Sequence, residues 1–237
     1  MLSGTFQDIL EVQSREEFRE GIVRFANELE FDYVSAMTVV DHSLTHSEFI
    51  NVDNTPQAFA DVFRDHSMGR KDPVMQHCKA GSLPIVWDQA TYVARGSADL
   101  WEQQAAFGYR NGIALALHFP EGRHFFIGID RRASLPRDAN ALTRIVADLQ
   151  LFAVHAQDAA SRLFVPADMR PERPNLTRRE LEALSWTMEG KTAWEVGAIL
   201  GISERTAVLH IQNAMHKLGT HNKHQAVLKA LRLGLIH

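Results

Sequence analysis

The chain of 237 residues contains a single cysteine, Cys78, which cannot form a disulfide within the chain. No apolar run approaches the roughly twenty residues that a membrane helix needs. The first twenty residues also lack the charged-then-apolar order of a secretion signal. These absences predict a cytoplasmic protein with no membrane partner. We interpret Cys78 as a small buried hydrophobe rather than a redox sensor.

Signatures of catalysis and of metal binding are also scarce. No glycines flank a serine as in a nucleophile elbow, and neither a P-loop nor a dinucleotide fingerprint occurs. His42 and His46 stand four residues apart, but their segment has no helical pattern, so we expect no metal site. The sequence therefore predicts a protein that is not an enzyme and carries no cofactor. An enzymatic first domain would instead turn over a small molecule.

The composition suits two folded domains joined by a linker. Hydrophobic residues make up 45% of the chain, which is enough apolar material for two cores. Three prolines fall between Phe164 and Pro174, a stretch without hydrophobic periodicity. We predict a first domain over residues 1–163, a stiff linker over 164–175 and a second domain over 176–237.

The second domain has the sequence pattern of four short helices. Three positions carry the residue pairs that satisfy amide donors at a helix start: Thr177 with Glu180, Thr192 with Glu195, and Asn222 with Gln225. Between the second and third helices, Gly201 can adopt the positive φ of a tight turn, and Ser203 can cap the next helix. Two short helices joined in this way predict a helix-turn-helix unit, which lays one helix in the major groove of DNA.

The helix expected over residues 204–218 has two faces. Its apolar residues recur at intervals of three and four and should pack inside the domain: Ala207, Ile211, Ala214, Met215 and Leu218. An outward pair of Val208 and Leu209 suits contact with thymine methyl groups, and Gln212 suits a bidentate contact with adenine. We predict that this helix reads DNA.

Ten residues are predicted to contact the bases or phosphates of double-stranded DNA: Lys191, Thr192, Arg205, Thr206, Val208, Leu209, Gln212, His216, Lys217 and Lys223. Charge agrees, since residues 175–237 hold eight Lys or Arg against five Asp or Glu, whereas the rest of the chain is acidic. A basic end on an acidic body suits nucleic-acid binding by that end. The alternative is a small helical bundle whose outward residues bind nothing.

The first domain is predicted to be α+β. Helices are expected from Ser14 onward and over residues 57–65, 73–79, 98–107 and 138–163, the last with an apolar stripe of Leu142, Ile145, Val146, Leu149 and Phe152. Strands are expected over residues 33–40, 49–52, 113–119 and 124–130, the last two forming a hairpin around 120–123. Strands between helices predict an antiparallel sheet sandwiched between helical layers.

The residues of the second domain also carry a resemblance. The run LSWTMEGKTAWEVGAILGISERT, continued through NAMHKLGTHNKHQAVLKALRLGLI, is similar to the DNA-binding domain of LuxR-type quorum-sensing regulators. Glu180, Leu184 and Gly190 match positions that this family fills in the same way. The Trp186-Thr187 step resembles the branch that responds to acyl-homoserine lactones. The resemblance implies an all-α, four-helix second domain and an autoinducer-binding first domain.

The same family implies roles for two residues of the first domain. In that family an aspartate accepts a hydrogen bond from the amide N–H of the ligand, and a later tryptophan packs on the lactone ring. Asp72-Pro73, followed by Pro84-Ile85-Val86-Trp87, resembles this arrangement and implies these roles for Asp72 and Trp87. From the residues alone, Asp72 is also a helix N-cap before a proline at the first helical position. Both roles are compatible because a carboxylate has two acceptor oxygens.

Two positions depart from the family pattern. The family places a tryptophan thirteen residues before the aspartate and a tyrosine nine residues before it, and these positions are Phe59 and Phe63 here. Both rings remain, but both donors to the ligand carbonyls are lost, at about 0.5–1.5 kcal/mol for each net hydrogen bond. At the hairpin position where some relatives supply a hydroxyl, this chain has Gly128.

Substitute donors for the ligand are expected among Tyr92, Trp101 and Tyr109. The full set of predicted ligand-binding residues is Phe59, Phe63, Asp72, Trp87, Tyr92, Trp101 and Gly128. Three interpretations stay open: a lactone receptor with a more apolar pocket, a receptor for a signal without the lactone carbonyl, or a domain that acts without ligand. The resemblance implies three partners, which are a small-molecule signal, a second copy in a homodimer, and a palindromic DNA site.

Overall fold

The computed structural model describes residues 4–41, 47–62, 71–119, 122–165 and 174–237. The chain separates into two compact units, one built on α1 to α7 and the other on α8 to α11. Phe63, His42, His46, the tip of the predicted hairpin and most of the predicted linker lie outside the described residues. Within the described ranges, no helix is both long enough and apolar enough to cross a membrane.

The first unit is built on a five-stranded sheet with the strand order β2-β1-β5-β4-β3. The strands are β1 (Tyr33–Asp41), β2 (Ser47–Asp53), β3 (Ile85–Trp87), β4 (Asn111–Phe119) and β5 (Arg123–Arg131). Strand β1 pairs antiparallel with both β2 and β5, and β3 pairs antiparallel with β4. The predicted antiparallel sheet is confirmed, with one additional short strand, β3.

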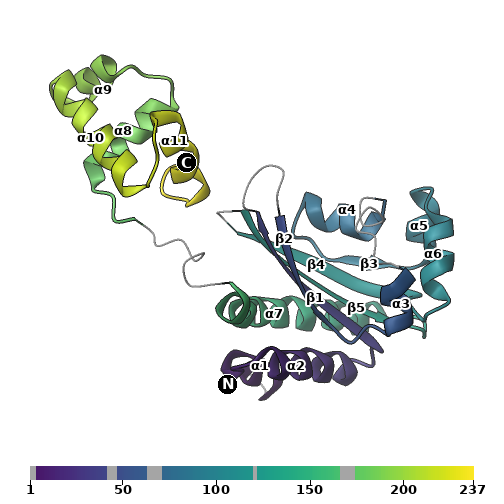
Figure 1. Cartoon of the computed structure of the whole chain (residues 1–237). Helices are drawn as coiled ribbons and strands as arrows, with labels where there is room; N and C mark the ends of the chain where they lie inside the picture. Colours follow the sequence, from purple (N-terminus) through teal and green to yellow (C-terminus); the bar gives the residue numbers. More distant parts are fainter. Residues whose placement is uncertain (1–3, 42–46, 63–70, 120–121, 166–173) are drawn as a thin grey trace. The chain divides into compact units, whose positions relative to one another are not determined.

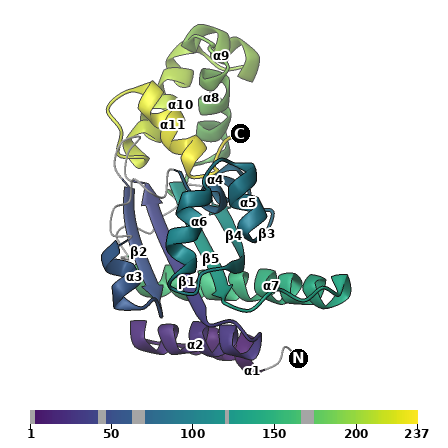
Figure 2. The same cartoon turned by 90° about the vertical axis from the view of Figure 1, so that its right-hand side faces the viewer.

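Helices cover both faces of this sheet (Figure 1). One face carries α1 (Gly4–Glu11), α2 (Arg15–Glu28) and α7 (Ala139–Phe164). The other carries α3 (Gln57–Val62), α4 (Pro73–Ala80), α5 (Gln89–Ala94) and α6 (Ala98–Ala105). The view turned by 90° shows α4 and α6 over the face opposite α7 (Figure 2). The predicted sandwich is therefore confirmed, whereas α1 and α5 have no counterpart among the predicted elements.

The face toward α2 and α7 is a continuous apolar core. Side chains alternate along β1, so Val34 turns to this face and lies opposite Ile129 of β5. Phe25 of α2 and Phe152 of α7 stack with ring centroids 3.8 Å apart. Leu149 and Phe152, from the predicted stripe of the long helix, are completely buried. This face holds the first unit together.

The second unit contains α8 (Arg178–Met188), α9 (Ala193–Leu200), α10 (Glu204–Lys217) and α11 (Lys223–Arg232), which confirms the four predicted helices. Reciprocal capping boxes begin α8 at Thr177 and α9 at Thr192, as predicted. The third predicted pair, at the start of α11, forms only one of the two hydrogen bonds of a capping box. Asn222 accepts a hydrogen bond from the amide of Gln225, but the Gln225 side chain accepts from His221 instead.

Candidate ligand-binding core and DNA-binding helices

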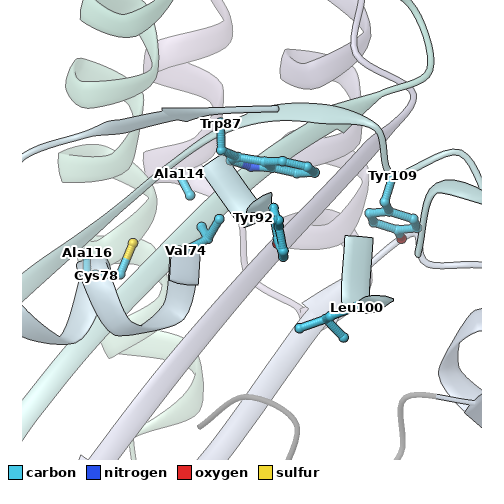
Figure 3. Close-up of a cluster of buried hydrophobic side chains, with 8 residues drawn as sticks. All are labelled: Val74, Cys78, Trp87, Tyr92, Leu100, Tyr109, Ala114 and Ala116. Carbon is cyan, nitrogen blue, oxygen red and sulfur yellow. The ribbon is translucent and has the colours of Figure 1, made fainter. Parts of the chain in front are cut away.

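A second cluster of buried side chains lies between the sheet and helices α4 to α6, and we call it the α4–α6 core (Figure 3). Its buried members are Val74, Cys78, Trp87, Tyr92, Leu100, Tyr109, Ala114 and Ala116. Trp87 and Tyr92 meet edge to face, with ring centroids 5.6 Å apart. Burial and the Asp72 carboxylate raise the pKa of Cys78 to about 12, so its thiol is a buried, neutral group, as predicted.

Asp72 lies at the N-terminus of α4 and is its N-cap, as predicted. Its Oδ1 atom accepts hydrogen bonds from the amides of Val74, at 2.7 Å, and Met75, at 3.2 Å. The Tyr92 hydroxyl donates to the same carboxylate, 3.2 Å from Oδ2. Burial raises the pKa of Asp72 against the opposing effect of these three hydrogen bonds. Oδ2 receives only the Tyr92 bond from the described residues, so it keeps capacity for another donor.

The three predicted substitute donors all have partners inside the protein. Tyr92 donates to Asp72, the Trp101 indole donates to the carbonyl of Arg110 at 3.0 Å, and the Tyr109 hydroxyl donates to Thr55 at 3.1 Å. A donor hydrogen that is already bonded serves a ligand only if that bond is broken. Trp101 and Tyr109 would have to give up these bonds to serve a ligand, whereas Tyr92 lies beside Asp72.

Phe59 lies at the edge of the α4–α6 core on α3. Its ring stacks on Tyr109 with centroids 4.2 Å apart and meets Phe107 edge-on. Gly128 lies in β5 on the sheet face of this core, where an added Cβ would stand 3.2 Å from the Phe126 ring and 3.6 Å from Ala114. The wall at both positions is apolar, so neither replaces the donors that the family pattern supplies.

Two buried polar residues of this region were not predicted from the sequence. Asp130 of β5 lies on the same sheet face as Gly128, and no described residue donates a hydrogen bond to its carboxylate. Burial, and then the charge of Asp72, raise the pKa of Asp130 well above its usual value. The side-chain nitrogen of Gln104 in α6 is also buried, without an acceptor of good hydrogen-bond geometry among the described residues. Strand alternation from Gly128 was the available signal for Asp130.

The turn between α9 and α10 has the geometry that the sequence predicts. Gly201 ends α9 with a φ of 65°, and Ser203 accepts a hydrogen bond from the amide of Thr206 at the start of α10. Gly197 is required by a close approach, because an added Cβ would lie 2.9 Å from the carbonyl oxygen of Ile202. Helix α10 therefore packs tightly on α9, as in a helix-turn-helix unit.

The buried and the exposed side chains of α10 lie on different faces of the helix, as predicted. Ala207, Ile211, Ala214 and Leu218 are buried, and Met215 is half-buried. The exposed residues at intervals of three and four form one row, which consists of Arg205, Leu209, Gln212 and His216. Leu209, within this row, is 51% exposed. Val208 is half-buried beside this row rather than fully outward.

Several predicted phosphate contacts have internal roles. The Lys217 ammonium binds the buried Glu180 carboxylate of α8 at 2.8 Å and also donates to the carbonyl of Asn175. Thr192 and Thr206 take part in the caps of α9 and α10. Other predicted contacts are Lys191, which is half-buried, and Lys223, which is exposed. We therefore omit Lys217 from the proposed phosphate contacts.

The described side chains bring together no group of three or more His, Cys, Asp or Glu that could hold a metal ion. Family comparison assigns both units. Residues 14–160 match the autoinducer binding domain, and residues 174–230 match the bacterial regulatory proteins of the luxR family. The chain belongs to the LuxR family. Its first unit is an autoinducer-binding domain, and its second is the DNA-binding domain of these transcriptional regulators.

Individual LuxR-family proteins are similar over nearly the whole chain. The transcriptional activator AnoR of Acinetobacter nosocomialis is 29% identical, over 96% of this chain and 95% of its own. SolR of Ralstonia nicotianae, another transcriptional activator, is 32% identical, over 94% and 92%. The crystal structure of Escherichia coli SdiA has a TM-score of 0.72 at 28% identity and covers 98% of this chain and 95% of its own. SdiA has also been solved in complex with octanoyl-rac-glycerol.

Proposed function

We propose that the α4–α6 core of this LuxR-family regulator binds a small signal molecule and that the bound state controls DNA binding by α10. One observation carries the proposal for the first unit. Asp72 places a carboxylate oxygen with spare acceptor capacity inside a largely apolar core, beside Trp87 and Tyr92. Such a core suits an amphipathic molecule with a hydrogen-bonding head and an apolar tail.

The chemistry of the signal follows in part from the relatives. Family membership supports an acyl-homoserine lactone or a related molecule. SdiA, which is similar along its whole length, has been solved with octanoyl-rac-glycerol, a fatty acyl chain with a glycerol head. Phe59 has no hydrogen-bond donor, which favours a signal whose carbonyl needs no donor from this position of the protein. A domain that acts without ligand remains the competing hypothesis.

We propose a homodimer that uses the long helix α7. Leu151 and Val154 are exposed on this helix by 40% and 54%, three residues apart on one side. Burial of two such apolar side chains against a second copy would remove them from water. Two α10 helices would then meet successive major grooves about 34 Å apart on a roughly palindromic site. Dimerisation adds affinity by effective concentration, since one α10 offers few cations.

On DNA we propose base contacts from the exposed row of α10 and phosphate contacts around it. Gln212 is placed to pair with adenine, and Leu209 with a thymine methyl group. The other proposed contacts, to bases or phosphates, are Lys191, Thr192, Arg205, Thr206, Val208, His216 and Lys223. A regulator of this kind acts in the cytoplasm, by binding rather than by catalysis, and needs no cofactor besides its signal. Residues 164–175 remain the proposed linker.

Two measurements test the proposed function. For the first unit, mass spectrometry of full-length protein purified from its native host should identify a small molecule, and adding that molecule back should raise the thermal midpoint of stripped protein. Protein that carries no small molecule, and whose midpoint is raised by no probe, would support action without ligand.

For the second unit, DNA fragments selected from a random library by the full-length protein supply the site. Gln212→Ala should then lose about 1–3 kcal/mol at one base pair of that site and little at the others. His224→Ala, an exposed change on α11, is the control. An equal loss on every sequence would rule out a base contact by Gln212.

A further inference from the structure

Asp130 is a buried acid without a partner, and it points into the α4–α6 core. It lies opposite Tyr33 in the β1–β5 pair, on the sheet face that carries Gly128. The residue is 9% exposed, and no described side chain or amide donates to its carboxylate. An added Cβ at Gly112 would lie closer than 3.0 Å to both Asp130 Oδ1 and Trp87 Nε1. Because Gly112 has no side chain, the Asp130 carboxylate and the Trp87 indole can both approach its backbone closely.

Gln104 is a second buried residue with an unused polar atom in the same region. It is 6% exposed, and its side-chain NH2 group has no acceptor with good hydrogen-bond geometry among the described residues. The Tyr92 hydroxyl links the two residues. Burial raises the pKa of Tyr92, and the charges of Asp72 and Asp130 add to this rise, whereas a side-chain hydrogen bond from Gln104 opposes it. The Tyr92 hydroxyl is bonded to Asp72, and Gln104 and Asp130 both lie close enough to act on it.

A buried N–H group without a well-placed acceptor, and a buried acid to which no described residue donates, favour a molecule that meets both. Asp130 offers acceptor oxygens, and Gln104 offers an N–H group. Asp72, which accepts from the Tyr92 hydroxyl, has spare acceptor capacity as well. We propose that this set binds a ligand head group with at least two hydroxyls, and that Asp130 and Gln104 are its specificity-determining contacts. This inference rests on the proposed function, since it names the signal class of the same core.

Hydroxyl groups fit these residues better than the two obvious alternatives. A hydroxyl donates and accepts at once, so a single one can donate to Asp130 and accept from Gln104. An ammonium group has no acceptor for Gln104, and a lactone ring has no donor for Asp130. Burial raises the pKa of Asp130 and so disfavours its charged form, the form that would attract an ammonium. A hydroxyl pairs with either form of the carboxyl.

Three probes with the same eight-carbon acyl chain isolate the head group. They are N-(2,3-dihydroxypropyl)octanamide with two hydroxyls, N-octanoyl-homoserine lactone with a ring carbonyl, and N-(2-aminoethyl)octanamide with an ammonium. Each is titrated into the full-length chain and into two variants, Asp130→Val and Gln104→Leu, by calorimetry and thermal melting. Asp99→Asn, an exposed change on α6, is the matched control.

The diol probe should bind the unchanged chain about tenfold or more tightly than the other two. Asp130→Val should weaken the diol about tenfold or more and leave the lactone unchanged, while Gln104→Leu should weaken the diol less. Without ligand, Asp130→Val should melt at the same or a higher temperature, because it removes an unpaired buried acid. A structural role for Asp130 predicts the opposite, a lower melting temperature without a change in probe preference.

Each other outcome overturns the inference. Tighter binding of the lactone or the amine contradicts the head-group class, and diol binding that survives Asp130→Val contradicts the assigned contact. If none of the probes binds, the inference also fails, and the small molecule extracted from native-host protein then decides the proposed function separately. An extracted molecule without hydroxyls would leave the proposed function standing and the inference refuted.

Discussion

Each unit of this regulator buries an acidic side chain, and the two acids have opposite surroundings. Glu180 in the second unit accepts from the Lys217 ammonium at 2.8 Å and from the amide of Thr177 at 2.7 Å. Asp130 in the first unit accepts from no described residue. Burial would raise the pKa of Glu180, but the bonds from Lys217 and Thr177 outweigh it and lower that pKa. The pKa of Asp130 rises unopposed.

In the second unit the hydrogen bonds of the buried acid come from the protein itself, whereas in the first unit we propose that they come from a ligand. The second unit satisfies its buried acid within its own fold, between α8 and α10. The first unit keeps unused hydrogen-bonding groups in the α4–α6 core, and the proposed ligand would stabilise the fold by meeting them. That stabilisation follows the ligand concentration and is about 2.7 kcal/mol at a hundredfold excess over Kd. Signal dependence is therefore expected in the first unit alone.

The largest predicted effect concerns the two lost donors of the first unit. Phe59→Trp combined with Phe63→Tyr should raise the affinity for N-octanoyl-homoserine lactone about tenfold or more, because two new hydrogen bonds each contribute about 0.5–1.5 kcal/mol. Calorimetric titration of the full-length protein measures the gain. Phe6→Tyr, on the opposite side of the sheet, is the control. A folded double variant with no gain would mean that the native ligand is held in a different way.

The next effect concerns the satisfied acid of the second unit. Glu180→Gln keeps the shape of the side chain but leaves the Lys217 ammonium without its charged partner. We expect a loss of about 1–3 kcal/mol in the free energy of unfolding, measured by denaturant titration. Glu182→Gln removes an exposed partner of Arg178 and Arg179 and should change stability little. Equal stability of the Glu180 variant and the unchanged protein would show that this pair does not stabilise the fold.

A smaller predicted effect distinguishes the capping role of Asp72 from its proposed ligand-binding role. Asparagine caps helices as well as aspartate does, so Asp72→Asn should change ligand-free stability by less than about 0.5 kcal/mol. The same variant should lose most of the thermal shift caused by the native ligand, because one acceptor becomes a donor. Asp72→Ala, which removes the cap as well, should lose about 1 kcal/mol without ligand. An equal loss in Asp72→Asn with and without ligand would leave only the capping role.

The smallest effect is a pH dependence of opposite sign at the two buried acids. The folded-state pKa of Glu180 is lowered, so its contribution to stability is present above the unfolded pKa of about 4.3 and is lost as pH falls through the folded value. The pKa of Asp130 is raised, so it destabilises the folded state increasingly as pH rises above about 3.9.

Denaturant titrations at several pH values between 4 and 7 measure both effects. At neutral pH the unchanged protein should be more stable than Glu180→Gln and less stable than Asp130→Asn. Both differences should shrink toward pH 4. Differences of the same sign at the two positions would contradict the contrast between the units.

Local patterns in the sequence predicted most of the fold. The caps at Thr177, Thr192 and Ser203 are short-range features, and they place three of the four helices of the second unit correctly. Alternation and periodicity likewise predicted the four longer strands and the buried stripe of α7. The missed elements α1, β3 and α5 are short, and packing on other elements determines them more than local propensity does.

The candidate site was less accessible from the sequence, because its defining contacts join distant residues. Asp72 could be predicted from the motif around it, but its bond with Tyr92 spans 20 positions. The partners that occupy Trp101 and Tyr109 depend on the packed arrangement of α6, β4 and the segment before α3. Lys217 appeared to be a free cation in the sequence because Glu180 lies 37 positions away. No local pattern marks Asp130 as unpaired.

The most direct test of the central claim is the affinity of the full-length protein for a selected DNA fragment, measured by fluorescence anisotropy with and without the small molecule recovered from native-host protein. The account predicts two separate curves for the unchanged protein and one shared curve for Asp72→Asn. Identical curves for the unchanged protein, at ligand concentrations that raise its thermal midpoint, would contradict control of DNA binding by the first unit.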